Sequence, residues 1–252
     1  MRLIASIALT LSLVGPARAD FRFDGPAEVQ DYVESNLLGI FYHELGHALI
    51  DILGLPIFGQ EEDAADVLSV FLLDAFWEEE TAVQLAYDTA FGFLGEAEER
   101  QAAGQDPPYW DVHGPDLQRY YNLICVFYGA NPEAREDVAR DLGLPEDRAA
   151  YCPEEYAQAD GSWGDVLQEL LHPGGGESLV MDDTDTSSDA GALTADLIAT
   201  EIAALNEEFR LPATLFVSVV SCGQANAFYD PSRREIIMCV EFADYLADAM
   251  PE

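Results

Sequence analysis

Lysine is absent from the 252-residue sequence, and the 11 basic residues, all arginines, face 48 aspartates and glutamates. The formal net charge is −37. A chain this acidic is repelled by phosphate backbones and anionic lipid headgroups, which disfavours nucleic acid and anionic membrane surfaces as partners. The acidic residues are spread along the whole length instead of forming a tail, which is typical of a solvated acidic surface.

Long apolar runs are also missing, because no stretch after the first residues approaches the roughly 20 uninterrupted apolar residues of a membrane helix. We therefore expect no membrane insertion. The N-terminus has Arg2, a short apolar run and small residues at 17–19, the pattern of a secretory signal peptide. We expect residues 1–19 to be removed and residues 20–252 to form a single exported domain, periplasmic or extracellular.

Cysteine is scarce, with four residues, and none of them has the C-x-x-C spacing of a zinc-thiolate site. An even number of cysteines in an exported protein indicates disulfides. Three connectivities are possible. We expect Cys125–Cys152 and Cys222–Cys239, because each bond would join neighbouring elements of structure.

Apolar periodicity predicts a mostly helical α+β fold. Helices are expected at residues 26–53, 60–77, 79–101, 115–129, 131–142 and 193–209. Extended segments are expected at residues 214–221, 225–229 and 235–242, before a short tail helix. Glycines and a proline between the first two helices predict an antiparallel pair of helices. Residues 172–191 combine three consecutive glycines with a run of aspartates, so we expect an exposed acidic loop there.

Histidine is scarce too, and two of the four histidines lie in one H-E-x-x-H motif, His43-Glu44-Leu45-Gly46-His47. On a helix, residues i and i+4 share a face, so both imidazoles can bind one metal ion. Glu44 then lies beside the open coordination position, where it can take a proton from bound water and pass one to a leaving amine. Zn²⁺ suits such ligands and lowers the pKa of its bound water to about 7, so the motif predicts a zinc-dependent hydrolase.

The third protein ligand is expected in the acidic start of the next helix. Glu62 and Asp66 are four residues apart, so one can bind the metal while the other accepts a hydrogen bond from the far nitrogen of a ligand histidine. Glu61, Asp63 and Asp66 remain alternative ligands, because acids in a first helical turn are also common for dipole reasons.

The H-E-x-x-H motif followed by Glu-x-x-Ala-Asp at 62–66 resembles the gluzincin class of metallopeptidases. The resemblance implies a zincin-like core in which Glu62 is the third zinc ligand and Asp66 its support. The separation between His47 and Glu62 is shorter than is usual in that class.

Three longer stretches, at residues 43–66, 110–129 and 222–242, resemble a bacterial metallopeptidase family whose members have no assigned function. The first stretch, which contains the motif, is the most specific. The resemblance implies a zinc peptidase that acts on a peptide or protein substrate, without indicating which one.

Peptide hydrolysis also needs a donor that stabilises the oxyanion. His113, in a loop before a helix, is our candidate for this catalytic role, with Tyr229 or Tyr120 as alternatives. His172, beside a proline, is assigned to the acidic loop.

Zincins usually present an edge strand beside the active-site helix, so that an extended peptide adds to the sheet through main-chain hydrogen bonds. In this sequence the strands follow the H-E-x-x-H helix instead of preceding it. We therefore hypothesise that residues 214–242 fold back beside that helix. The alternative is a purely structural hairpin held by a disulfide.

The sequence thus favours a secreted zinc metallopeptidase with Glu44 as general base. Two alternatives remain: a catalytically silent zincin-fold protein that binds peptides or holds structural zinc, and a zinc hydrolase that is not a peptidase. No feature indicates the oligomeric state.

Overall fold

The computed structural model describes residues 27–250, which form a mostly helical α+β fold with a small mixed sheet. The helices are α1 (Ala27–Leu53), α2 (Glu61–Phe76), α3 (Glu79–Ala102), α4 (Asp116–Ala130), α5 (Glu136–Asp141), α6 (Glu146–Ala149), α7 (Cys152–Ala159), the π-helical turn η1 (Asp160–Gly164), α8 (Asp165–Leu170), α9 (Asp189–Glu208) and α10 (Glu241–Ala249). The strands are β1 (Leu179–Thr184), β2 (Leu215–Val220), β3 (Ala227–Asp230) and β4 (Glu235–Cys239). No helix between residues 27 and 250 is long and apolar enough to cross a membrane. The expected signal peptide at residues 1–19 lies outside the described residues.

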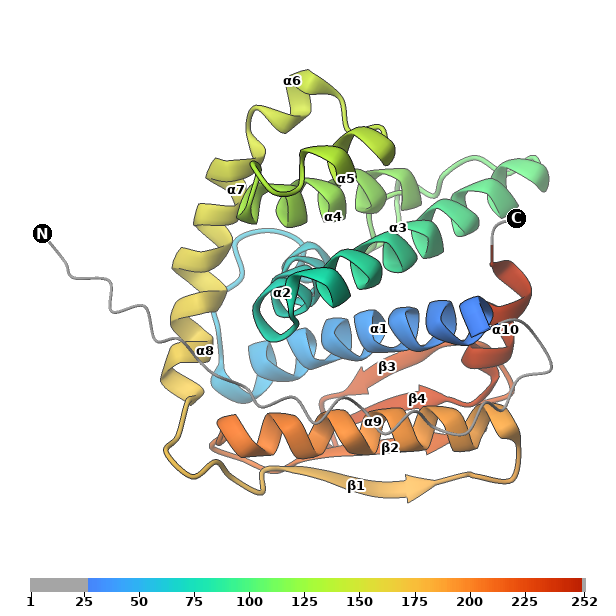
Figure 1. Ribbon diagram of the computed structural model, residues 1–252. Helices are drawn as coiled ribbons and strands as arrows, with labels where there is room; N and C mark the ends of the chain where they lie inside the picture. The colour runs from blue at the N-terminus through green and yellow to red at the C-terminus, as the bar shows by residue number, and fades with distance from the viewer. Residues whose placement is uncertain (1–26, 251–252) are drawn as a thin grey trace, which may run out of the picture.

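Helix α1 is the central element of the fold. The sheet lies on one side of it and helices α2, α3 and α4 lie on the other (Figure 1). Most of its side chains are therefore buried, including Val33, Phe41 and Leu49. A helix that is apolar on nearly all sides is one that the rest of the protein surrounds. This burial places the H-E-x-x-H segment inside the molecule.

Helices α1 and α2 run antiparallel and touch at Gly46. A Cβ atom on Gly46 would lie 2.9 Å from the Cα atom of Ala65, closer than real Cβ contacts. Glycine at this position therefore lets the two backbones approach. The antiparallel pairing brings His43 beside Asp66 and His47 beside Glu62.

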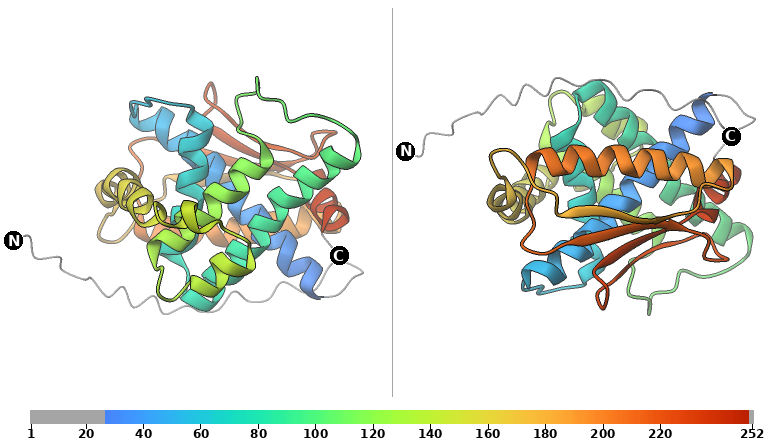
Figure 2. Two further views of the ribbon diagram at one scale, coloured as in Figure 1. Left: turned by 90° about the horizontal axis from the view of Figure 1, so that it is seen from above. Right: turned by 90° about the horizontal axis from the view of Figure 1, so that it is seen from below.

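The sheet has the strand order β1-β2-β4-β3, in which β3 is an edge strand. Strands β1, β2 and β4 are parallel, and β3 is antiparallel to β4. Helices α1 and α9 cover the same face of the sheet. When the molecule is seen from below, the sheet lies in front of α1 (Figure 2, right). Side chains at alternate positions of β2, such as Leu215 and Val217, are fully buried on this face.

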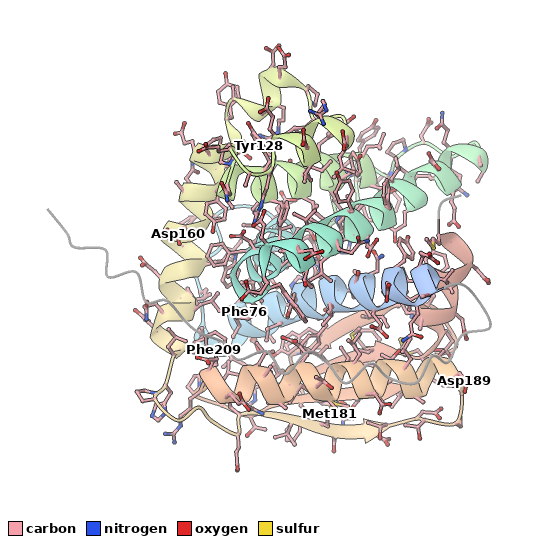
Figure 3. All side chains as sticks on the ribbon, in the orientation of Figure 1. Phe76, Tyr128, Asp160, Met181, Asp189 and Phe209 are labelled. Carbon is pink, nitrogen blue, oxygen red and sulfur yellow. A yellow bond between two sulfur atoms is a disulfide. The ribbon has the colours of Figure 1, made fainter. Side chains whose placement is uncertain are left out.

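An aromatic contact joins the helical layer to the sheet layer. Phe76, at the end of α2, and Phe209, directly after α9, lie close together (Figure 3), with ring centroids 5.7 Å apart. Both expected disulfides are present, Cys125–Cys152 between α4 and α7 and Cys222–Cys239 between the end of β2 and the end of β4. The second bond holds the segment that leads into the edge strand.

The expectation of a loop over residues 172–191 was wrong in part. Residues 179–184 form β1, and α9 begins at Asp189. The strand was missed because most of its side chains are exposed, so its sequence lacks apolar alternation. Edge strands are commonly protected by such charged residues.

Two further expectations on the helices need correction. The helix expected at 131–142 is shorter, at 136–141, and residues 146–170 contain helices that periodicity did not predict. The three expected strands lie close to their predicted positions, and β2 and β3 both pair with β4.

Candidate metal centre

Three potential ligand atoms converge at the crossing of α1 and α2. The Nε2 atom of His47 lies 3.1 Å from Nε2 of His43 and 3.1 Å from Oε2 of Glu62. Nε2 of His43 lies 3.2 Å from the same Oε2 atom. At a tetrahedral zinc ion with bonds of about 2.0–2.1 Å, ligand atoms lie about 3.3 Å apart. The triangle therefore has the dimensions of one face of a zinc coordination tetrahedron.

The far nitrogen of each histidine is held by a carboxylate. Nδ1 of His43 lies 2.7 Å from Oδ1 of Asp66, and Nδ1 of His47 lies 2.8 Å from Oε1 of Glu61. An ionised carboxylate only accepts hydrogen bonds, so each Nδ1 carries the proton and donates it. In the neutral rings the Nε2 lone pairs then point into the triangle, as metal ligation requires.

Arg119 of α4 fixes Asp66 in turn, through two hydrogen bonds of 2.8 and 2.7 Å. Burial alone would raise the pKa of Asp66, but the hydrogen bonds and charge of Arg119 hold it well below its usual range. The guanidinium also lies 4.4 Å from the ring centroid of Phe93. Sequence reasoning missed Arg119, because no local spacing connects it to a motif so far away in the chain.

The electrostatics of the site require positive charge at the triangle. Burial would lower the pKa of His43, but its hydrogen bonds to Asp66 and Glu62 outweigh burial and raise it to about 9. Burial would raise the pKa of Glu62, but its hydrogen bonds with His113, His43 and His47 hold it far below the usual range. The three groups thus come together only with protons or a metal ion between them.

Glu44 lies beside the triangle, buried, and lines the cleft described below. Burial raises the pKa of its carboxyl group. Within residues 27–250 no hydrogen bond or ion pair engages this carboxylate, although His43 and His47 attract it electrostatically. A carboxylate in that state can exchange a proton with a water molecule bound next to it.

His113 and Tyr229 both reach the site. Nε2 of His113 lies 2.9 Å from Oε2 of Glu62, and its side chain is 43% exposed, so it faces the cleft. The Tyr229 hydroxyl donates to Oδ2 of Asp51 at 2.7 Å, one helical turn beyond His47. This contact also shows that β3 lies beside α1, as hypothesised from the sequence.

Two other residues lie elsewhere. Tyr120 is buried among the helices and donates to the main-chain oxygen of Leu142 at 2.8 Å, so its suggested oxyanion role was wrong. His172 lies in the exposed connection between α8 and β1. The alternative ligands Glu61 and Asp66 contact Nδ1 atoms instead of the triangle.

The triangle lies at the bottom of an open cleft of about 1220 Å³. Residues of three segments line it: 54–62, 108–116 and 225–231. The loops of these segments lie along the same side of the molecule in both views of Figure 2. Among residues 27–250, the only other group with metal-ligand spacing is Cys222, Cys239 and Glu241, whose cysteines form a disulfide. The cleft therefore leads to the one triangle with free ligand atoms in the described residues.

A family model described as "Putative metallopeptidase" matches residues 5–167 and 181–252. The chain belongs to this family. No curated protein and no solved structure matches it. The family resemblance inferred from the sequence is thus confirmed.

The family match includes all three segments that line the cleft, together with the H-E-x-x-H helix. It leaves out residues 168–180, which comprise the end of α8, the connection after it and the first residues of β1.

Proposed function

We propose that the protein is an exported zinc-dependent metallopeptidase in which His43, His47 and Glu62 bind Zn²⁺ and Glu44 is the general base. One observation carries this proposal: the Nε2 atoms of His43 and His47 and Oε2 of Glu62 lie 3.1–3.2 Å from one another. Lone pairs at this separation repel each other unless positive charge lies between them. Imidazole and carboxylate ligands in a tetrahedral arrangement favour zinc.

When bound, zinc would supply a Lewis acid that polarises the substrate carbonyl and lowers the pKa of a coordinated water. The residues of the chain would then move the protons. Glu44 takes a proton from the attacking water and hands it to the nitrogen of the cleaved amide. His113, which reaches the triangle from the cleft, donates a hydrogen bond to the developing oxyanion. Tyr229 is the alternative donor, and in this role its hydroxyl would exchange its hydrogen bond to Asp51 for one to the oxyanion.

The edge strand β3 supports binding of an extended peptide. Cys239 of β4 donates its N–H to the oxygen of Asn226 at 3.1 Å. Because antiparallel pairs alternate, the main-chain groups of Phe228 also face β4, whereas those of Ala227 and Tyr229 face away from the sheet. These outward groups lie at the cleft wall, where a substrate could add as a further strand.

The arrangement favours the gluzincin class within a zincin-like fold. The H-E-x-x-H helix lies against the edge strand β3, which is antiparallel to its neighbour β4. The next helix provides Glu62 and Asp66. The order along the chain differs from the usual zincin order, because the strands follow the helix. A zinc centre in this protein would therefore have the zincin arrangement of helix and edge strand with a different order of these elements along the chain.

Metal analysis and proteolysis together test the proposal. We expect the zinc-loaded protein to cleave members of a random peptide library, and chelation to abolish cleavage. Glu44→Gln should keep zinc but lose cleavage by at least about 10³-fold, whereas Glu62→Ala should lose both. Glu98→Gln, an exposed charge change on α3, serves as the matched control.

The two alternatives give other outcomes. Zinc uptake without cleavage of any peptide or protein would favour a catalytically silent zincin-fold protein. Hydrolysis of small esters or amides without peptide cleavage would favour a zinc hydrolase of another class. Absence of metal uptake by the folded protein would refute the metal site itself.

Export is supported by the two disulfides, which persist mainly in oxidising compartments. Expression of the full chain with its natural leader in a bacterial host tests this part. We expect the mature N-terminus near Asp20 and recovery outside the cytoplasm. Retention of Met1 in the cytoplasmic fraction would contradict it.

A further inference from the structure

A smaller cavity of about 170 Å³ extends from the cleft into the helical layer behind His43. It lies among α1, α2, α3, α4 and α10. The residues that line both the cavity and the cleft, and so mark the opening between them, are Ile40, His43, Glu96, Arg119, Phe242 and Tyr245. The cavity is therefore a side pocket of the active-site cleft.

Glu96 of α3 brings to this opening a carboxylate that no hydrogen bond among the described residues engages. Within residues 27–250 no hydrogen bond or ion pair reaches its carboxylate, and burial raises its pKa. The charge of Arg119 stabilises the ionised form of Glu96, but both hydrogen bonds of its guanidinium go to Asp66. A partly buried carboxylate without a hydrogen-bonded cation attracts positive charge, so the pocket favours a positively charged occupant.

Tyr32 of α1 brings a second polar group to the same cavity. Its side chain lines the cavity and is 2% exposed, yet its hydroxyl has no hydrogen-bond partner in the described part of the chain. Burial, followed by the charges of Asp88, Glu96 and Glu99, raises its pKa to about 12. A donor group bound in the cavity would give this hydroxyl a hydrogen-bond partner.

The remaining walls near the opening are apolar. Ile40 and Phe242 line both the cavity and the cleft, and Phe93 and Leu246 line the cavity. A long aliphatic stem that ends in several N–H donors matches this combination of apolar walls and buried acceptors.

Strand direction shows which substrate residue would meet the pocket. Tyr229 of β3 bonds to Asp51 near the C-terminal end of α1, whereas Ala227, at the start of β3, pairs with Met238 close to α10. Helix α10 packs beside the N-terminal half of α1, because Phe242 and Tyr32 line the same cavity. Strand β3 therefore runs in the same direction as α1.

A peptide paired antiparallel to β3 would run against the direction of α1. It would pass from the Asp51 end of the cleft, across the triangle of ligand atoms, towards Ile40. Antiparallel pairing is the more stable arrangement per residue. The side pocket, which opens at Ile40 and His43, then faces the residue that directly follows the cleaved bond.

From this geometry we infer that the side pocket binds an arginine or lysine side chain, and that the enzyme cleaves peptides on the N-terminal side of a basic residue through recognition by Glu96. This inference rests on the proposed peptidase function and adds the substrate class. The charge of the cleft agrees with a basic substrate, because carboxylates outnumber arginines among the residues that line the cleft. The two arginines, Arg100 and Arg119, are already paired with Asp116 and Asp66.

Binding and cleavage measured separately test the inference. The binding probe is a peptide with a single central arginine, compared with the same peptide carrying citrulline, which has the same shape without the charge. Calorimetry on the zinc-loaded Glu44→Gln protein should show the arginine peptide bound about tenfold or more tightly. Adding Glu96→Gln should remove that preference, whereas adding Glu98→Gln, an exposed change on the same helix, should preserve it.

The cleavage arm uses the active protein and a library in which each peptide position varies. We expect cuts before arginine or lysine, and Glu96→Gln should lower kcat/KM for these peptides about tenfold or more while neutral peptides stay unchanged. Equal binding of arginine and citrulline peptides, or a preference that persists in Glu96→Gln, would overturn the inference. Selective binding without any cleavage would uphold the pocket and refute the peptidase instead.

Discussion

Arg119 and Asp66 form two parallel hydrogen bonds, although the two residues are 53 positions apart in the chain. Asp66 in turn holds Nδ1 of His43. The three side chains thus connect α4 to the H-E-x-x-H helix through α2. The position of a proposed metal ligand therefore depends on a helix that contributes no ligand itself.

We expect Arg119→Met to weaken both the fold and zinc binding. Removing Arg119 leaves the buried Asp66 carboxylate without its cation and with only its hydrogen bond from His43, which costs about 3 kcal/mol of unfolding free energy. The loss of orientation at His43 should weaken zinc affinity about 10–100-fold. Urea unfolding and competition with a fluorescent chelator measure the two effects. Arg140→Met is the control, because its guanidinium pairs with Asp137 on the surface. Unchanged zinc affinity would show that His43 does not depend on this connection.

Gly46→Ala should push α2 away from α1. The new methyl group would lie 2.9 Å from the Cα atom of Ala65, where backbone must move to make room. Such overpacking costs about 1–3 kcal/mol, and it would also shift Glu62, one helical turn from the contact. We expect a lower melting temperature and weaker zinc binding. Gly59→Ala is the matched control, because nothing lies within 4 Å of the added atom. A Gly46→Ala protein with normal zinc affinity would mean that Glu62 does not depend on the close approach of the helices.

Much of the site could be predicted from the sequence because its signals are local. The H-E-x-x-H spacing requires only a helix, and the apolar periodicity of α1 to α4 predicted that helix and its neighbours closely. The choice between Glu61 and Glu62 was harder, since adjacent residues on a helix point in different directions. The crossing of α1 and α2 at Gly46 decides which of them meets the Nε2 atoms of the histidines.

The features that were missed depend on contacts between distant segments. Strand β1 takes its form from pairing with β2, while its exposed acidic residues give no strand signal. Arg119 is recognisable only once α4 lies against α2. The pocket around Glu96 requires α1, α2, α3, α4 and α10 in place, so no pattern in a single stretch could predict it.

His113→Ala separates two roles for this histidine. If His113 stabilises the oxyanion, the variant should keep its zinc and its KM while kcat falls about 10²–10³-fold. Its Nε2 atom is 2.9 Å from Oε2 of Glu62, close enough to act as a further ligand instead. Loss of zinc in His113→Ala, measured by atomic absorption, would therefore assign it to the metal. His172→Ala, on the exposed connection before β1, is the control and should change neither quantity.

The burial of Glu201 predicts that the stability of the fold depends on pH. The residue is buried beneath α1, and the Tyr42 hydroxyl donates to its carboxylate at 2.8 Å. Burial raises the pKa of Glu201 to about 7, although the hydrogen bond from Tyr42 opposes the shift. The unfolded chain releases this proton near pH 4.3, so between about pH 4.3 and 7 the folded state binds the proton more tightly. Stability must fall as pH rises through that window, by about 3 kcal/mol in total.

Glu201→Gln should remove this penalty, because the amide oxygen can still accept from Tyr42 while no charge is buried. We expect the metal-free variant to exceed the parent protein by up to about 3 kcal/mol in unfolding free energy at pH 8 and to match it at pH 4. Urea unfolding at the two pH values provides the measurement, with metal removed because zinc binding also varies with pH. Glu207→Gln, exposed on the same helix, carries the same charge change and should show little difference at either pH. An equal gain at both pH values would mean that packing around residue 201, and not ionisation of the buried carboxyl, sets its contribution.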